Sequence, residues 1–174
     1  MDTYPISKIQ DQFRLINKMY PESPAYNQAS VFEINGSLNF NILEQSLNII
    51  IERHHSLRTN FNETQLGPIQ VVNETLHISL PVIELREVGD LTSEKIDRMI
   101  KDEISSPFDL YKGPLLRIKI FRHKPDKCYL CITMHHIITD LHSKQLFAME
   151  LSSVYNSLLD GVKIALDEQL QQYR

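Results

Sequence analysis

The residues most able to do chemistry lie together at the end of an apolar run. His135 and His136 are adjacent, and Asp140 follows four residues after the second histidine. Two imidazoles and a carboxylate this close can form an acid–base site, because an imidazole takes up or releases a proton near neutral pH. Both histidines could instead be structural residues, and the pattern alone leaves the two interpretations open.

The residues before this cluster predict that the two histidines point in opposite directions. Residues 128–136 are rich in β-branched, aromatic and other apolar side chains, which predicts a strand. Successive side chains in a strand face opposite sides of a sheet, so His136 should share a face with Met134 and His135 with Thr133. The end of a strand is a position from which a side chain can reach a cleft. We therefore expect one histidine to reach the cleft and the other to be structural.

The remaining periodicity predicts a mixed α/β fold, of the α+β type, in which a mixed β-sheet is layered with helices. The last two strands should form a hairpin, since a short polar turn separates them. The expected strands are 26–34, 57–61, 69–72, 78–85, 115–121 and 129–134. The expected helices begin near 40, 92 and 140, with a shorter helical tail towards Arg174.

Length and composition predict one domain that spans residues 1–174. The chain has 42% hydrophobic residues and a formal net charge of -4, so it offers no basic field for nucleic acid or for an anionic membrane. It has no apolar run long enough to span a bilayer and no signal-peptide pattern at its start, which predicts a cytoplasmic protein. No phosphate-binding glycine motif is present, which argues against a nucleotide-dependent enzyme acting alone.

Two further pairs of residues invite a site. Cys128 and Cys131 have C-x-x-C spacing, but residues three apart in a strand point to opposite faces, so we expect buried thiols and no metal. His54 and His55 lie at a predicted helix end, where we expect solvated or capping roles.

Four segments together resemble the condensation domains of nonribosomal peptide synthetases, which have the chloramphenicol acetyltransferase-like fold. They occur in the expected order and extend over nearly the whole chain, which is far more specific than a lone histidine motif. The segments are residues 7–13, similar to the opening SxxQ segment, 52–61, similar to RHxxLRTxF, 107–117, similar to FDLxxGPLLR, and 135–140, similar to HHxxxDG.

The resemblance implies an acyltransferase that forms amide bonds. In this family, an acyl or aminoacyl thioester on the phosphopantetheine of a donor carrier protein is attacked by the amine of an aminoacyl group on an acceptor carrier protein. No cofactor is expected to bind directly. The family's domain has two lobes and is about two and a half times longer than this chain, so the resemblance implies the N-terminal lobe without the C-terminal lobe. That lobe alone should be inactive.

The resemblance also implies roles for single residues. His136 would be the catalytic histidine, either as the general base for the amine or as a hydrogen-bonding group that positions it. His135 would be structural. Asp140 would form an ion pair with Arg53, or alternatively with Arg58, and hold the loop of the active site. Loss of one partner of such a buried pair costs about 3–5 kcal/mol, which is the effect expected for Asp140→Ala.

One departure from the family pattern and several alternatives remain open in the sequence. Leu141 replaces the glycine of the motif, and leucine resists backbone conformations that glycine adopts. The lobe could therefore be a non-catalytic module that docks carrier proteins. It could also be the N-terminal lobe of an epimerisation domain or of a related acyltransferase. A lobe without its partner should expose an apolar inter-lobe face, which predicts self-association.

Overall fold

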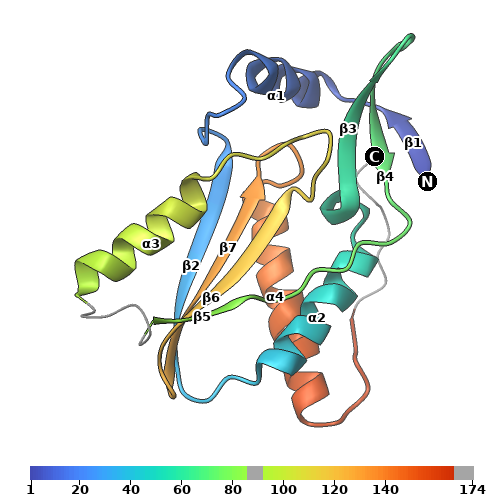
Figure 1. Ribbon diagram of the computed structural model, residues 1–174. Coiled ribbons are helices and arrows are strands. Elements are labelled where there is room, and N and C mark those ends of the chain that lie inside the picture. The colour runs from blue at the N-terminus through green and yellow to red at the C-terminus, as the bar shows by residue number, and fades with distance from the viewer. Residues whose placement is uncertain (86–91, 167–174) are drawn as a thin grey trace.

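The computed structural model describes residues 1–85 and 92–166. The predicted mixed α/β fold is confirmed, and Figure 1 shows its arrangement. The predicted tail towards Arg174 lies largely outside the described residues. The strands are β1 (Asp2–Pro5), β2 (Asn27–Asn35), β3 (Thr59–Thr64), β4 (Gly67–Val72), β5 (Val82–Glu84), β6 (Leu116–Lys124) and β7 (Lys127–His135). The helices are α1 (Lys8–Met19), α2 (Phe40–Arg53), the short 3-10 helix η1 (His55–Arg58), α3 (Ser93–Ser105) and α4 (Leu141–Leu159).

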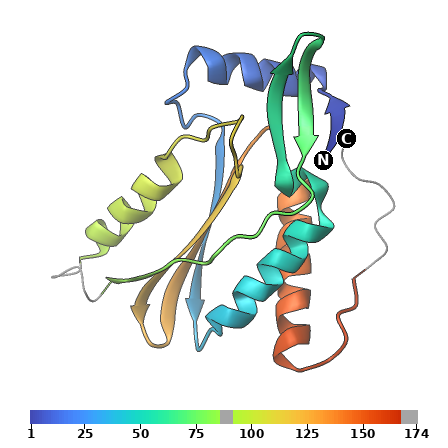
Figure 2. The same cartoon turned by 45° about the vertical axis from the view of Figure 1, so that its right-hand side comes forward.

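The larger sheet has the strand order β2-β7-β6-β5 and carries the two histidines. Strands β6 and β7 form the predicted antiparallel hairpin, β2 pairs antiparallel with β7, and β5 pairs parallel with β6. Helices α2 and α4 cover one face of this sheet, and α3 covers the other (Figure 2). Because both faces are covered, β7 is buried along most of its length, as its nearly continuous apolar sequence requires.

The two faces of the sheet have separate hydrophobic cores. The larger core lies between the sheet and helices α2 and α4, and includes Leu47, Ile50 and Val154, each fully buried. The smaller core lies under α3, where Ile96 and Ile100 contact Phe121 of β6. Cys128 belongs to the larger core and Cys131 to the smaller one, so the two thiols face opposite sides of the sheet as the strand prediction requires.

Helix α1 was not among the helices that the periodicity predicted. It begins with a capping box, in which the Ser7 hydroxyl accepts from the Gln10 backbone N–H and the Gln10 side chain accepts from the Ser7 N–H. The SxxQ segment is therefore a helix start. Figure 1 shows α1 at the top of the molecule, beside the small antiparallel sheet β1-β4-β3.

Two of the predicted strands differ from the structure. The segment 57–61 begins with the 3-10 helix η1 and becomes strand β3 only at Thr59. The strand expected over residues 78–85 forms a ladder only at Val82–Glu84. Before that point, the Asn48 side chain binds both the N–H and the C=O of Ile78, and a Glu44 carboxylate oxygen accepts from the Leu80 N–H. Side chains of α2 thus satisfy backbone groups that a strand partner would otherwise bind.

No helix within the described ranges is both long enough and apolar enough to cross a membrane.

Candidate functional site

The backbone of the histidine pair is fixed by the neighbouring strands. The His135 N–H donates to Leu115 O at 3.0 Å, and the His136 N–H donates to Tyr26 O at 2.8 Å. Strand β7 ends at His135, and the chain then turns, with the Ile138 N–H donating to His135 O at 3.1 Å. These bonds therefore fix the backbone positions from which both imidazole side chains project.

The His136 ring is held in one orientation by two contacts. Its Nδ1 lies 2.7 Å from Thr139 O, and its ring is stacked on Phe13 of α1, with centroids 5.2 Å apart. A carbonyl oxygen can only accept, so Nδ1 must carry the proton and donate it. In neutral His136 the lone pair is therefore on Nε2, which has no hydrogen-bond partner among the described residues. This atom can accept a proton or a hydrogen bond from a substrate.

The His135 ring has a different environment. The side chain is buried between the rings of Phe13, Tyr26 and Phe108, and its Nδ1 accepts from the Ile137 N–H at 3.1 Å. Burial, together with the nearby His136, lowers the pKa of His135 to about 4 from 6.5. His135 is thus a neutral core residue with its proton on Nε2, which agrees with the structural role expected for it.

The low pKa of His135 predicts an acid-sensitive fold. Below pH 6.5 the unfolded chain protonates this histidine, whereas the folded chain keeps it neutral down to pH of about 4. As the pH is lowered from 6.5 towards 4, the free energy of unfolding should therefore fall by up to about 1.4 kcal/mol for each pH unit. Urea denaturation at several pH values measures this slope. His135→Asn keeps an acceptor for the Ile137 N–H but does not titrate, so an equally steep slope in that variant would contradict the assignment.

A hollow of about 340 Å³ lies beside His136. Ile9, Gln10 and Phe13 of α1 line one side of it, and Ser56 of η1, residues 136–140 and Ser143 of α4 line the rest. Three of the four motif segments thus contribute to one hollow. The fourth contributes indirectly, because the edge of the Phe108 ring meets the His135 ring at a centroid distance of 6.1 Å. The motifs are far apart in sequence, and the fold brings them to the end of β7.

The structure corrects the role expected for Asp140. Its carboxylate caps helix α4: it accepts from the Ser143 N–H at 2.7 Å and from the Ser143 hydroxyl, while the Asp140 N–H donates back to Ser143 Oγ. These bonds from Ser143 lower the pKa of Asp140. Asp140 is exposed to solvent at the helix start, and the expected ion pair with Arg53 or Arg58 is replaced by this capping box.

This geometry changes the expected cost of Asp140→Ala. Loss of an N-cap costs about 1 kcal/mol of folding free energy, well below the 3–5 kcal/mol of a broken buried pair. Thermal or urea denaturation measures the difference. Asn39→Ala is a matched control, since Asn39 caps α2 through its side chain and the Ile42 N–H. A loss for Asp140→Ala several times larger than for Asn39→Ala would show that the carboxylate does more than cap.

The two arginines of the second motif have other partners. Arg53 Nε lies 3.1 Å from a carboxylate oxygen of Glu150 on α4, and His54 Nε2 lies within hydrogen-bond distance of the other oxygen. His54 is the C-cap of α2, as its position predicted, and its side chain in addition binds Glu150. Arg58 donates to Asn73 O and so holds the end of strand β4. The motif connects α2 to α4 and to the small sheet, and its arginines lie outside the hollow.

Leu141 is compatible with the helix that begins after Asp140. It is the first residue of α4 and is 70% exposed. Within the described residues only glycines have a positive φ, so the backbone at position 141 demands no conformation that leucine resists. The replacement of the motif glycine leaves the helix start intact.

Sequence reasoning missed three residues of this site. Phe13 stacks on His136, Phe108 contacts His135, and Glu150 joins the two long helices. Glu150 had a readable signal, because it lies on the apolar stripe of α4 between Phe147 and Val154, where a carboxylate needs a buried partner. The contacts of Phe13 and Phe108 depend on tertiary packing and have no comparable signal in the sequence.

Comparison with known proteins decides the family. The family model for the condensation domain matches residues 1–174, the whole chain. The chain belongs to the condensation domain family. It is 36% identical over 170 residues to one of the linear gramicidin synthase proteins of Brevibacillus parabrevis, and the match covers 97% of this chain and 2% of that synthase. It is also 36% identical over 154 residues to surfactin synthase subunit 2 of Bacillus subtilis (strain 168), and this match covers 88% of this chain and 4% of that synthase.

Solved structures have the same fold. The starter condensation domain of rhizomide synthetase RzmA matches with a TM-score of 0.88 and 27% identity, over 96% of this condensation-domain chain and 40% of the RzmA chain. The first condensation domain of the calcium-dependent antibiotic synthetase matches with a TM-score of 0.82 and 22% identity, over 95% of this chain and 40% of that one, which shows the shared fold. The chain thus spans less than half of each solved domain.

Proposed function

We propose that this chain is the N-terminal lobe of a condensation domain that forms an amide bond between groups held as thioesters on carrier proteins. The observation that carries the proposal is the His136 imidazole, whose Nδ1–H is donated to Thr139 O and whose Nε2 is left for a substrate at the hollow. The amine of the acceptor attacks the thioester carbonyl carbon, a C–N bond forms, the C–S bond breaks, and the donor thiol leaves. Nε2 takes the amine proton or accepts a hydrogen bond that positions the amine.

The hollow suits the thioester end of a phosphopantetheine arm. Ile9, Phe13, Ile137 and Ile138 give it apolar groups, and polar residues that include Gln10, Ser56 and His136 line the rest. Sites that bind small organic groups typically combine apolar walls with placed polar groups. A variant of the RzmA starter condensation domain was crystallised in complex with C8-CoA and Leu-SNAC, which supports the same class of substrates here.

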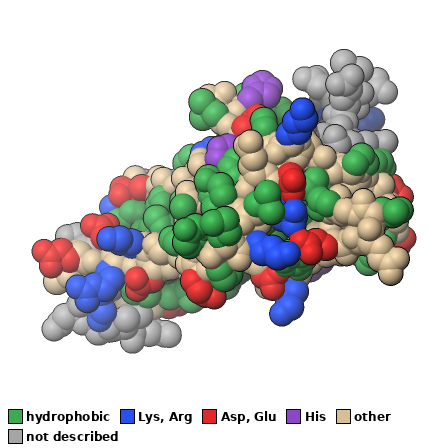
Figure 3. Space-filling view, turned by 90° about the horizontal axis from the view of Figure 1, so that it is seen from above, with side chains coloured by type: hydrophobic (Ala, Val, Ile, Leu, Met, Phe, Trp, Pro, Cys, Tyr) green, Lys and Arg blue, Asp and Glu red, His purple; other side chains and the backbone are tan. Residues whose placement is uncertain are grey.

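We propose that the C-terminal lobe covers the face that contains this hollow. Ile9 is 63% exposed beside it, and Figure 3, viewed from the α1 side, shows hydrophobic side chains gathered in the middle of this face. Water would reach the thioester freely at so open a site, so one lobe alone should be inactive. Without its partner lobe, this face is also where the chain would self-associate.

The test uses the complete two-lobed domain with loaded donor and acceptor carrier proteins. Mass spectrometry of the acceptor carrier protein should show a mass gain equal to the transferred acyl group. An epimerisation lobe would instead invert a stereocentre without a change of mass. A docking module would bind the carrier proteins and leave both thioesters unchanged, and either result would overturn the proposal.

A further inference from the structure

The C-terminal end of helix α3 is held by side chains from the sheet. The last turn of the helix contains no basic residue, and its C-cap, Ser106, has a β-region backbone with φ of -65° and ψ of 131°. The final carbonyls of a helix lack partners within the helix and need other donors. Two side chains of the larger sheet supply them, Arg117 from β6 and Asn27 from β2.

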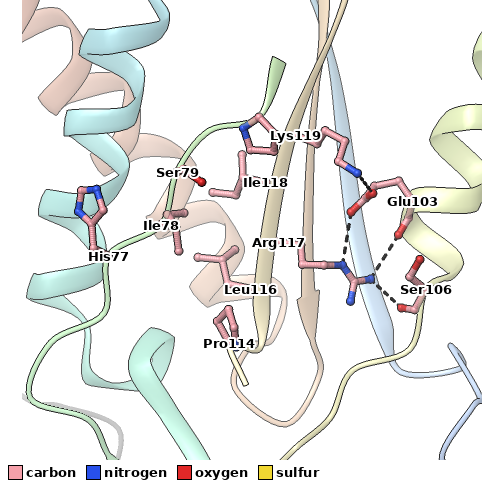
Figure 4. A pocket seen from close by; sticks show the side chains of 11 residues that line it. His77, Ile78, Ser79, Glu103, Ser106, Pro114, Leu116, Arg117, Ile118 and Lys119 are labelled. Carbon is pink, nitrogen blue, oxygen red and sulfur yellow. Dashed lines mark hydrogen bonds and ion pairs between the residues drawn. The ribbon is translucent and has the colours of Figure 1, made fainter. Parts of the chain in front are cut away.

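Arg117 binds several groups of this turn at once. Its guanidinium donates to Ser106 O at 2.6 Å, to Pro107 O at 3.1 Å and to Glu103 O at 3.3 Å. Its Nε also lies 3.4 Å from a carboxylate oxygen of Glu103. Figure 4 shows this guanidinium turned from β6 towards Glu103 and Ser106, next to a hollow of about 410 Å³. The planar fork of an arginine can make these bonds together, whereas a lysine ammonium cannot.

Asn27 binds the same turn from the neighbouring side. Its Nδ2 donates to Ile104 O at 2.8 Å and to Ser106 O at 2.7 Å. In the ladder between β2 and β7, Asn27 is the direct partner of His135. We name Arg117 and Asn27 the α3 clamp. Asn27 therefore lies directly beside the buried histidine, and Arg117 is paired with Thr133, two residues before it.

Phe108 connects the clamp to the histidine pair. The Arg117 guanidinium carbon lies 3.8 Å from the centroid of the Phe108 ring, a cation–π contact. The Phe108 ring is buried, and its edge meets the His135 ring at 6.1 Å with an interplanar angle of 87°. His135 in turn precedes His136 in the chain. A continuous series of packed groups thus leads from Arg117 to the catalytic imidazole.

We propose that Arg117 is a positioning residue for the reaction at His136. By fixing residues 103–107 it sets the place of Phe108, which packs against His135 and so fixes the end of β7 from which His136 projects. This inference rests on the proposed function of His136. Small displacements of a reacting group have large effects on rate, because the near-attack geometry is narrow.

Arg117→Lys in the complete domain tests the proposal, with Arg122→Lys as the matched control. Arg122 also lies on β6 and has the same two kinds of contact: an ion pair with a Glu84 carboxylate oxygen at 3.0 Å and a cation–π contact with the Phe40 ring, whose centroid is 5.5 Å away. It pairs with Cys128 at the other end of β7, far from the histidines. Arg117→Lys should lower kcat by roughly 10- to 100-fold with little change in KM. Arg122→Lys should leave both constants within about twofold of the parent.

A second measurement separates positioning from general stability. In NMR spectra of this chain, Arg117→Lys should shift the ring signals of Phe108 and His135, and Arg122→Lys should not. Asn27→Ala, which removes the other half of the clamp, should shift the same signals if Arg117→Lys does not fold. Unmoved ring signals, or equal losses of kcat in the two lysine variants, would overturn the proposal. If the parent domain forms no amide at all, the proposed function fails, whereas displaced Phe108 and His135 signals would still support the clamp.

Discussion

His136→Ala is expected to lower the rate of amide formation by the complete domain by about 10²- to 10⁴-fold. The alanine removes the imidazole at the hollow. In the neutral ring, the hydrogen bond from Nδ1 to Thr139 O leaves the lone pair on Nε2, on the opposite side of the ring. The ring is partly exposed and stacks on one face against Phe13, so its loss should cost folding about 1 kcal/mol or less. Single-turnover kinetics with loaded carrier proteins measure the rate, and thermal denaturation measures the stability.

His142→Ala is the matched control for this variant. His142 is also a histidine near the start of α4, but its side chain is exposed and does not line the hollow. Its removal should leave amide formation within about twofold of the parent. Undiminished product on the acceptor carrier protein with His136→Ala would show that the imidazole is not required.

Glu150→Ala is expected to lower the free energy of unfolding by about 3 kcal/mol. The Glu150 side chain is 10% exposed and binds both Arg53 and His54, so the alanine leaves the arginine without this carboxylate at the interface of α2 and α4. For a domain of this size, such a loss lowers Tm by roughly 6–12 °C. Differential scanning calorimetry of the chain measures it.

Two further variants test the cause of that loss. Glu33 forms an ion pair with Lys127 at 2.9 Å on the surface, where its side chain is 46% exposed and solvent screens the pair, so Glu33→Ala should cost much less stability than Glu150→Ala. A double variant, Arg53→Met with Glu150→Met, removes both charges and should recover part of the stability. Similar melting of Glu150→Ala and Glu33→Ala would contradict a buried stabilising pair.

The sequence predicted the large elements of the fold from the spacing of their apolar residues. The β6–β7 hairpin follows from two apolar runs around a polar turn, and α2 and α4 follow from apolar residues at helical spacing. Strand β5 is shorter than predicted, because the backbone groups of Ile78 and Leu80, which precede it, are bound by side chains of α2. Helix α1 was missed although its capping box and the helical spacing of Ile9, Phe13 and Ile16 were both visible in the sequence.

The different environments of the two histidine side chains could also be predicted, but not the partners of the charged residues. Successive side chains of a strand point to opposite faces, so His135 and His136 are separated independently of how the other elements pack. An ion pair depends on which helices meet, and 97 residues separate Arg53 from Glu150. Asp140 was assigned to an arginine by resemblance, whereas local geometry gives it to the N–H and hydroxyl of Ser143, three residues away. Short-range capping was the interaction that the sequence itself supported.

Long-range 1H–15N correlation spectra of the His136 ring, recorded on the 15N-labelled chain near neutral pH, test most directly whether this imidazole can accept a proton from the attacking amine. The hydrogen bond to Thr139 O predicts that the neutral ring carries its proton on Nδ1 and has its free lone pair on Nε2. The opposite tautomer, with the proton on Nε2, would place a donor at the hollow and contradict the role proposed for His136.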